Sequence, residues 1–139
     1  MRYPFKGKHI DITTLRIEGA YKDSRHPSSV TFVTDPKLDY VRRDFTVNAM
    51  YLDEQYNLLD YCKGQKDLEN KTIRFIGDPK TRIMEDPLRI VRAERFKERI
   101  GFEIEEKTKN AIDELRYLLA KLNPEKLKEE QRKGWKGQL

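Results

Sequence analysis

The sequence has one cysteine, two histidines and no long hydrophobic run. Cys62 has no second thiol for an internal disulfide, and neither histidine has neighbours at the spacing of zinc ligands. No stretch of about 18 apolar residues is present, and the basic N-terminus lacks the apolar core of a signal peptide. These absences argue against a disulfide scaffold, a zinc domain and a membrane span, and they predict a cytoplasmic protein with no membrane partner.

Charged residues are abundant and basic ones are in excess. The 139 residues include 29 Lys and Arg against 24 Asp and Glu, a formal net charge of +5. A basic domain of this size favours an anionic partner such as RNA or a nucleotide, although many basic domains have a purely structural role. The length is enough for about one domain with a modest core.

The first part of the sequence shows the patterns of β structure interrupted by turns. Alternation of apolar and polar residues predicts a strand over 9–17, with Asp11 on its polar side. A loop over 18–29, rich in serine with one proline, and a short strand over 30–33 follow.

A helix and a hairpin are predicted next. Asp35 is a suitable N-cap with proline after it, and the predicted helix continues to residue 50. Its predicted buried stripe consists of Leu38, Val41, Phe45 and Ala49. Two apolar runs around the polar residues 53–57 then predict a hairpin, followed by a short helical turn and a short extended segment.

From residue 78 onward the patterns are almost wholly helical. One helix is predicted over 85–100 and ended by Gly101, a second over 105–122, and a third opened by Asn123 and proline. The fold class is therefore α+β. The change in composition predicts two domains, a β-rich head over 1–77 and a helical domain over 78–139.

The predicted helix over 85–100 carries many opposed charges. Glu85, Arg89 and Arg92 are spaced so that they share one helical face, with Arg82 one turn earlier and Asp86 one turn from Arg89. One interpretation is a set of ordinary surface ion pairs. The other is base recognition: a carboxylate beside a guanidinium matches an exocyclic amino group beside a ring acceptor, an edge that cytosine and adenine share.

A second polar cluster lies in "RRDFTVNAM", residues 42–50. Asp44 and Asn48 are four residues apart and, on a helix, could reach one ligand such as a ribose, while the arginines suit phosphate. A solvated helix face explains the same pattern. On the first predicted strand, Asp11 could coordinate Mg²⁺ together with other acids, or simply face solvent.

Together these stretches resemble one family. "RRDFTVNAM", "DYCKGQKDLENKTIRFIGDPKTR" and "EDPLRIVRAERFKERIGFEIEEKT" are similar, in order and spacing, to motifs of the bacterial-type (class II) tRNA nucleotidyltransferases and poly(A) polymerases. "IDITTLRIEGAYKDSRHPSSVTFV" resembles the strand and flexible loop of that family, and "NPEKLKEEQRKG" resembles its neck motif near the tRNA contact. The resemblance covers nearly the whole chain, from Asp11 to Trp135.

The resemblance implies a fold, a reaction and its partners. The fold would be a partial antiparallel-sheet nucleotidyltransferase head, which in the family holds two Mg²⁺ ions and the triphosphate, followed by an all-helical neck that reads the base. The reaction would be attack of a 3′-OH, at the end of a tRNA or another RNA, on the α-phosphate of CTP or ATP, with pyrophosphate leaving.

It also implies roles for individual residues. Asp86 and Arg89 would read the base, and Arg92 would support them from the next turn. The residues implied for the ribose and the phosphates are Arg42, Asp44 and Asn48. Asp11 resembles the third acid of the family's metal site.

One part of the family pattern is missing. Ahead of "RYPFKGKHIDITTLR" the family carries a glycine-rich, phosphate-binding turn and a DxD pair that supplies most metal ligands, and the sequence contains neither. We therefore expect catalysis by this chain alone to be severely impaired or absent, and a missing N-terminal half or a second chain to be needed.

Three hypotheses follow from the sequence. The first is a fragment of a tRNA nucleotidyltransferase that adds CCA, CC or A, or of a poly(A) polymerase. The second is a noncatalytic RNA- or nucleotide-binding remnant of the same family. The third is a structural helical module whose charges only form surface ion pairs.

Overall fold

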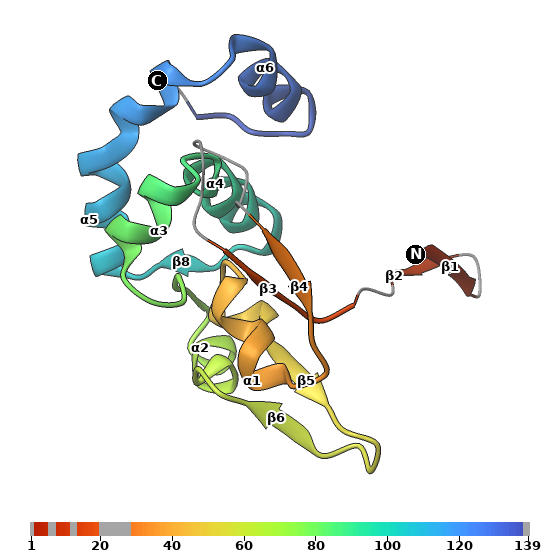
Figure 1. Ribbon diagram of the computed structural model, residues 1–139. Helices are drawn as coiled ribbons and strands as arrows, with labels where there is room; N and C mark the ends of the chain where they lie inside the picture. Colours follow the sequence, from red (N-terminus) through yellow and green to blue (C-terminus); the bar gives the residue numbers. More distant parts are fainter. Residues whose placement is uncertain (1, 6–7, 12–13, 20–28, 138–139) are drawn as a thin grey trace.

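The structure is a computed structural model that describes residues 2–5, 8–11, 14–19 and 29–137. Short antiparallel ribbons occur in the first half of the chain and helices dominate the second, which confirms the α+β fold class (Figure 1). Among the described residues, no helix has the length and apolar character needed to cross a lipid bilayer.

In the residues that the structure describes, four two-stranded sheets account for the strands. β1 (Arg2–Phe5) pairs with β2 (Lys8–Asp11), β3 (Arg16–Glu18) with β4 (Val30–Phe32), and β5 (Met50–Leu52) with β6 (Leu58–Asp60), all antiparallel. β7 (Thr72–Ile73) pairs in parallel with β8 (Glu103–Ile104). The single strand predicted over 9–17 is wrong, because its two ends belong to different ribbons with different partners.

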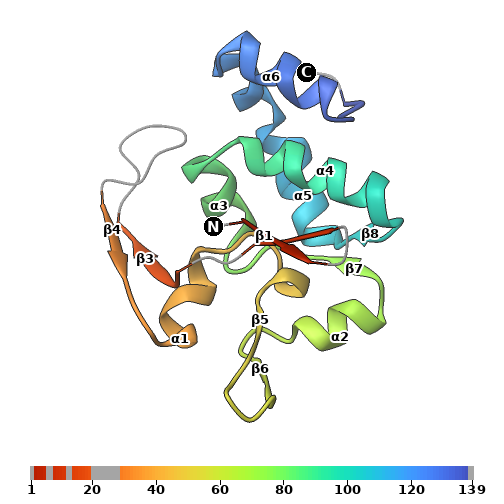
Figure 2. The same ribbon diagram turned by 90° about the vertical axis from the view of Figure 1, so that its right-hand side faces the viewer.

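Six α-helices and three 3₁₀ turns complete the described part of the chain. The α-helices are α1 (Pro36–Asp39), α2 (Gly64–Glu69), α3 (Pro79–Glu85), α4 (Leu88–Ile100), α5 (Glu106–Leu115) and α6 (Pro124–Arg132). The 3₁₀ turns are η1 (Tyr40–Arg42), η2 (Thr46–Asn48) and η3 (Arg116–Lys121). Helix α4 lies between α6 on one side and the α1–β5 segment on the other (Figures 1 and 2).

The long helix predicted from Asp35 is only partly formed. The Asp35 side chain caps α1 by accepting from Lys37 N at 2.9 Å, as predicted, but the backbone becomes extended at Arg43, with φ −74° and ψ 159°. The reason is tertiary: Phe45 forms a β-bridge with Phe75 and its ring stacks on the Phe75 ring with centroids 5.4 Å apart.

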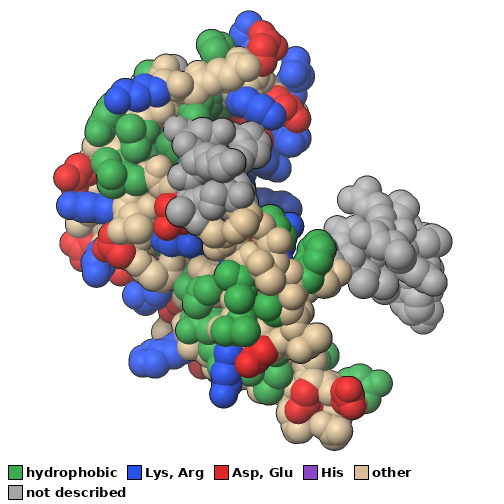
Figure 3. Space-filling model, viewed as in Figure 1, with side chains coloured by type: hydrophobic (Ala, Val, Ile, Leu, Met, Phe, Trp, Pro, Cys, Tyr) green, Lys and Arg blue, Asp and Glu red, His purple; other side chains and the backbone are tan. Residues whose placement is uncertain are grey.

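The predicted buried stripe of that helix is therefore half wrong. Phe45 and Ala49 are buried, but Leu38 and Val41 are 45% and 49% exposed. Exposed hydrophobic side chains also occur on the neighbouring β3–β4 ribbon, and such side chains gather over this lower half of the molecule in Figure 3.

The helix predicted over 85–100 is interrupted at its start. Asp86 is extended, with φ −151° and ψ 94°, so that α3 ends at Glu85 and α4 begins at Leu88. The cause is Pro87, because a proline disfavours the helical conformation in the residue before it. At the other end Gly101 adopts a left-handed φ of 72° and its N–H bonds to Lys97 O at 2.8 Å, as the sequence predicts.

The other local predictions agree more closely. The hairpin turn over 53–57 is present between β5 and β6, and α2 is the predicted short helix. Asn123 caps α6 through a bond from Glu125 N at 2.9 Å. The helix predicted over 105–122 is formed, but it tightens to 3₁₀ geometry in η3.

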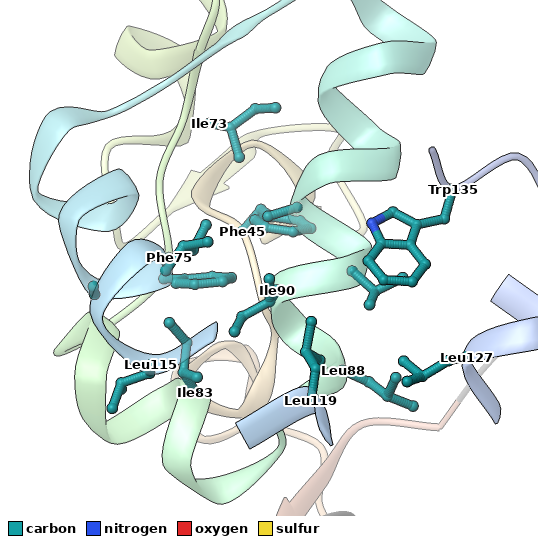
Figure 4. Packing of buried hydrophobic residues seen from close by; sticks show 14 residues of the cluster. Phe45, Ile73, Phe75, Ile83, Leu88, Ile90, Leu115, Leu119, Leu127 and Trp135 are labelled. Carbon is teal, nitrogen blue, oxygen red and sulfur yellow. The ribbon is translucent and has the colours of Figure 1, made fainter. Parts of the chain in front are cut away.

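One hydrophobic core joins the two halves of the chain. It brings Phe45 and Phe75 from the first half together with residues of α3, α4, α5 and α6, and with Trp135 (Figure 4). The predicted division at residues 77/78 stays a prediction, since packing is continuous across that point. This core fixes α4 relative to the 44–48 segment, and a cleft lies between them.

Candidate nucleotide-binding cleft

A cleft of about 890 Å³ opens between η1, the 44–48 segment and helix α4, with residues after α6 at its rim. Its volume is in the range of small-molecule sites. The cleft is lined by six residues that the sequence singles out: Arg42, Asp44, Asn48, Asp86, Arg89 and Arg92. The structure therefore brings these six together, while Asp11 ends β2 with its side chain outside the described residues.

Arg89 is the central side chain of the cleft wall. It lies in the first turn of α4 and is only 2% exposed, which is unusual for an arginine. Its Nε donates to Asp44 Oδ1 at 2.8 Å, and its Nη1 donates to Arg82 O at 2.7 Å and to Glu85 Oε2 at 3.3 Å. These partners compensate the buried charge and hold the guanidinium in one position.

Asp86 lies in the break between α3 and α4. One carboxylate oxygen accepts from Leu88 N at 3.3 Å and so helps to cap α4, while the other accepts from Arg92 Nη2 at 2.9 Å. The residue is buried at the wall of the cleft. A carboxylate and a guanidinium, Asp86 and Arg89, are thus presented from adjoining backbone with little rotational freedom.

Asp44 connects the two sides of the cleft. Its Oδ1 receives the hydrogen bond from Arg89, and its Oδ2 lies 2.8 Å from Arg92 Nε in an ion pair. The local cause is the β-bridge, because Ile76 N bonds to Asp44 O at 3.0 Å and fixes this backbone. Asn48 is in η2, so the two residues do not share a helix face as predicted, although both line the cleft.

Several lining residues were not identified from the sequence. Lys133 and Lys136 are brought to the rim because Trp135 between them is buried in the core and its Nε1 donates to Glu94 Oε1 at 3.3 Å. The other basic lining residues that the sequence did not single out are Arg16, Arg95 and Arg99, whereas Arg43 belongs to the "RRDFTVNAM" cluster whose arginines were expected to suit phosphate. Acidic residues in the lining are fewer, so the cleft favours an anionic ligand.

Asp39 is a further residue that sequence reasoning missed. Its carboxylate is fully buried behind the cleft and bonds to Arg42 Nε at 2.8 Å and Arg43 Nε at 3.0 Å. The signal was available, because Asp39 stands three and four residues before these arginines in the sequence.

The described residues do not form a magnesium site. Among them no group of three or more His, Cys, Asp or Glu side chains could hold a metal ion. The two aspartates in the cleft lining, Asp44 and Asp86, are both engaged by arginines. The donor set that Mg²⁺ requires is therefore not met by this part of the chain.

The comparisons with known proteins agree on one family. The profile of the Poly A polymerase head domain matches residues 1–74. A CCA-adding enzyme of Pediococcus pentosaceus is 46% identical over 121 residues, which cover 87% of this chain and 31% of that enzyme. The chain spans about a third of the length of the curated relatives it matches.

Solved structures show the same likeness. The Bacillus stearothermophilus CCA-adding enzyme in complex with CTP superposes with a TM-score of 0.77 and 34% identity, over 94% of this chain and 31% of that one. A tRNA nucleotidyltransferase complexed with a primer tRNA and an incoming ATP analog gives a TM-score of 0.56 and 36% identity, over 61% and 25%. With its head-domain match, its relatives and its fold in agreement, the chain belongs to the bacterial-type family of tRNA nucleotidyltransferases and poly(A) polymerases.

Proposed function

We propose that this chain is the nucleotide-selecting part of a CCA-adding tRNA nucleotidyltransferase. The single observation that carries the proposal is the convergence of Arg42, Asp44, Asn48 and the Asp86/Arg89/Arg92 group on one cleft. The CTP complex of the Bacillus stearothermophilus enzyme and the primer-tRNA complex of a tRNA nucleotidyltransferase support CTP, ATP and tRNA as the ligands.

Base selection follows from the fixed pair at the cleft wall. The Asp86 carboxylate accepts from the exocyclic amino group of cytosine or adenine, and the Arg89 guanidinium donates to the adjacent ring nitrogen. Uracil and guanine present a carbonyl and a ring N–H instead, so both contacts are lost. Because Asp86 and Arg89 are buried, a mismatched base would leave polar groups unpaired beside them, which is costly.

The sugar and the phosphates fit the opposite wall. Asp44 and Asn48 supply an acceptor and an amide for the ribose hydroxyls, and Arg42 supplies a guanidinium for the phosphates. The proposed reaction is transfer of CMP or AMP from CTP or ATP to the 3′-OH of tRNA, with pyrophosphate as the second product. Poly(A) polymerase activity and noncatalytic RNA binding are the alternatives.

Nucleotidyltransferases of this family use divalent metal ions, and we propose Mg²⁺ as the ion. Since the side chains that the structure describes do not build a site for it, we assign none of them to metal binding. We expect the ligands to come from elsewhere, with Asp11, whose side chain is not described, as one candidate.

The first test measures nucleotide binding. Calorimetric titration of the 139-residue chain with the four ribonucleoside triphosphates should show tighter binding of CTP and ATP than of UTP and GTP. Asp86→Asn should remove this preference, whereas Asp113→Asn, an exposed aspartate on α5 outside the cleft, should keep it. Equal binding of all four triphosphates by the unaltered chain would contradict base selection.

A second test addresses the reaction. In a chimera, the part of this chain that matches the Pediococcus pentosaceus enzyme over 121 residues replaces its counterpart in that enzyme. Incorporation of each labelled nucleotide into tRNA lacking its 3′ end is then measured. Incorporation of C and then A supports the proposal. Long runs of A would favour the poly(A) polymerase alternative, and loss of incorporation in a folded chimera would favour a noncatalytic remnant.

A further inference from the structure

The buried carboxylate of Asp39 lies directly behind the wall of the cleft that carries Arg42 and Arg43. It ends α1 and has no exposed surface. Oδ1 accepts from the backbone N–H of Arg16 at 2.7 Å and from Arg42 Nε at 2.8 Å. Oδ2 accepts from Arg43 Nε at 3.0 Å and from the Tyr51 hydroxyl at 2.7 Å. Four donors, from β3, η1, the residue after η1 and β5, therefore meet on one side chain.

Asp39 carries a full negative charge in this position. Burial alone would raise the pKa of its carboxyl, but the bonds from Arg16, Tyr51, Arg42 and Arg43 outweigh it and lower the pKa to about 2. Each oxygen accepts two hydrogen bonds, so the carboxylate has no capacity left for a ligand. Any contribution to ligand binding must act through the groups that it holds.

The two arginines that it holds face the cleft. Both line the cleft, and Asp39 engages only the Nε atom of each. Within the described part of the chain, the terminal nitrogens of Arg42 and Arg43 make no hydrogen bond. The backbone beneath them is fixed as well, because Arg82 Nη2 donates to both carbonyl oxygens at 2.9 Å.

We propose that Asp39 is a positioning residue that holds Arg42 and Arg43 side by side as a pair of guanidinium groups for the phosphates of the bound nucleotide. The inference rests on the proposed function. One carboxylate against two guanidinium groups leaves a surplus positive charge at the wall, and the Nη atoms are left to bind an anion. A carboxylate with a purely structural role would need only one arginine to balance its charge.

The test is a phosphate series on the 139-residue chain. Affinities for CMP, CDP and CTP are measured by calorimetry for the unaltered chain and for Asp39→Asn, with folding of each checked by circular dichroism. An amide at position 39 presents an N–H₂ group to donors, so the arginines lose their alignment. We expect the CTP/CMP affinity ratio to fall about ten-fold, while CMP affinity changes less than about two-fold.

A matched control separates positioning from general destabilisation. Asp67 is a second buried aspartate, bonded to Thr46 Oγ1 at 2.6 Å and Arg74 Nε at 3.0 Å, and it does not line the cleft. Asp67→Asn should lower stability and leave the CTP/CMP ratio unchanged. If Asp39→Asn does not fold, Tyr51→Phe removes one donor to the same carboxylate and should lower the ratio about two-fold.

A double-mutant cycle distinguishes an effect through the arginines from a purely structural role of Asp39. If Asp39 acts through the arginines, adding Asp39→Asn to an Arg42→Gln/Arg43→Gln background should cause no further fall in the CTP/CMP ratio. An additive fall, or an unchanged ratio in Asp39→Asn, overturns the inference while the proposed function stands. Failure of the unaltered chain to bind CTP would overturn the proposed function itself.

Discussion

Replacement of Asp39 by asparagine should make the stability of the protein less dependent on pH. The Asp39 carboxylate is fully buried and accepts four hydrogen bonds, two of them from arginines. These bonds lower its pKa from 3.8 to about 2 in the folded protein, against the effect of burial. Asparagine has a similar shape and no charge, so the pH-dependent part of the difference between the two proteins reports the contribution of ionisation.

The size and sign of the effect follow from this pKa. A folded pKa below the unfolded one means that ionisation stabilises the fold above the unfolded pKa, and that this stability is lost as the pH falls through the folded pKa. At about 1.36 kcal/mol per pKa unit, the contribution at neutral pH is about 2 kcal/mol. About half of it should remain at about pH 3 and little at about pH 2.

Urea unfolding of both proteins at a series of pH values measures this contribution. The difference in free energy of unfolding between the unaltered chain and Asp39→Asn should be constant above about pH 5 and shrink below about pH 4. Other titrating groups are common to both proteins and cancel in the difference. The part of the difference that is left at low pH would report the cost of the misplaced amide. A difference of the same size at every pH would refute the reasoning.

Two other substitutions test separate parts of the structure. Asp44→Ala should weaken the preference for CTP over dCTP, because the proposed acceptor for the ribose hydroxyls is lost; an unchanged ratio in parallel titrations would remove Asp44 from the sugar site. Gly101→Ala should lower the free energy of unfolding by about 1 kcal/mol, because residue 101 has a φ of 72° while the space around an added Cβ is open. The urea midpoint of that variant is the measurement. An unchanged midpoint would show that alanine adopts the left-handed conformation at position 101 without a loss of stability.

Local signals in the sequence predicted local structure well. The caps at Asp35 and Asn123, the left-handed stop at Gly101 and the hairpin turn over 53–57 depend on neighbouring residues only, and each is present. The broken helix after Arg42 was not predicted, because its cause is the pairing of Phe45 with Phe75, thirty positions along the chain. Helical periodicity alone cannot reveal a competing long-range partner.

In the candidate site too, the residues could be predicted from the sequence but their long-range contacts could not. Residue types and motif order identified six residues that line one cleft. Their contacts were not predictable from spacing, because the bond from Arg89 to Asp44 joins residues 45 positions apart. The pairing of Asp39 with the two following arginines was within reach of spacing rules, but a surface ion pair looks the same in sequence as a buried one.

The break at Asp86 explains why the charges around α4 are so dense. In a continuous helix over 79–100, the Asp86 side chain would project from the helix surface and the backbone N–H of Leu88 would be engaged within the helix. The extended conformation imposed by Pro87 instead turns its carboxylate toward Leu88 N and Arg92. Arg89, in the turn that follows, is then buried and requires acceptors, which the Arg82 carbonyl, Glu85 and Asp44 provide. The acids and arginines of this stretch are thus interdependent: the break orients Asp86, and the surrounding acceptors allow a buried arginine to stand beside it.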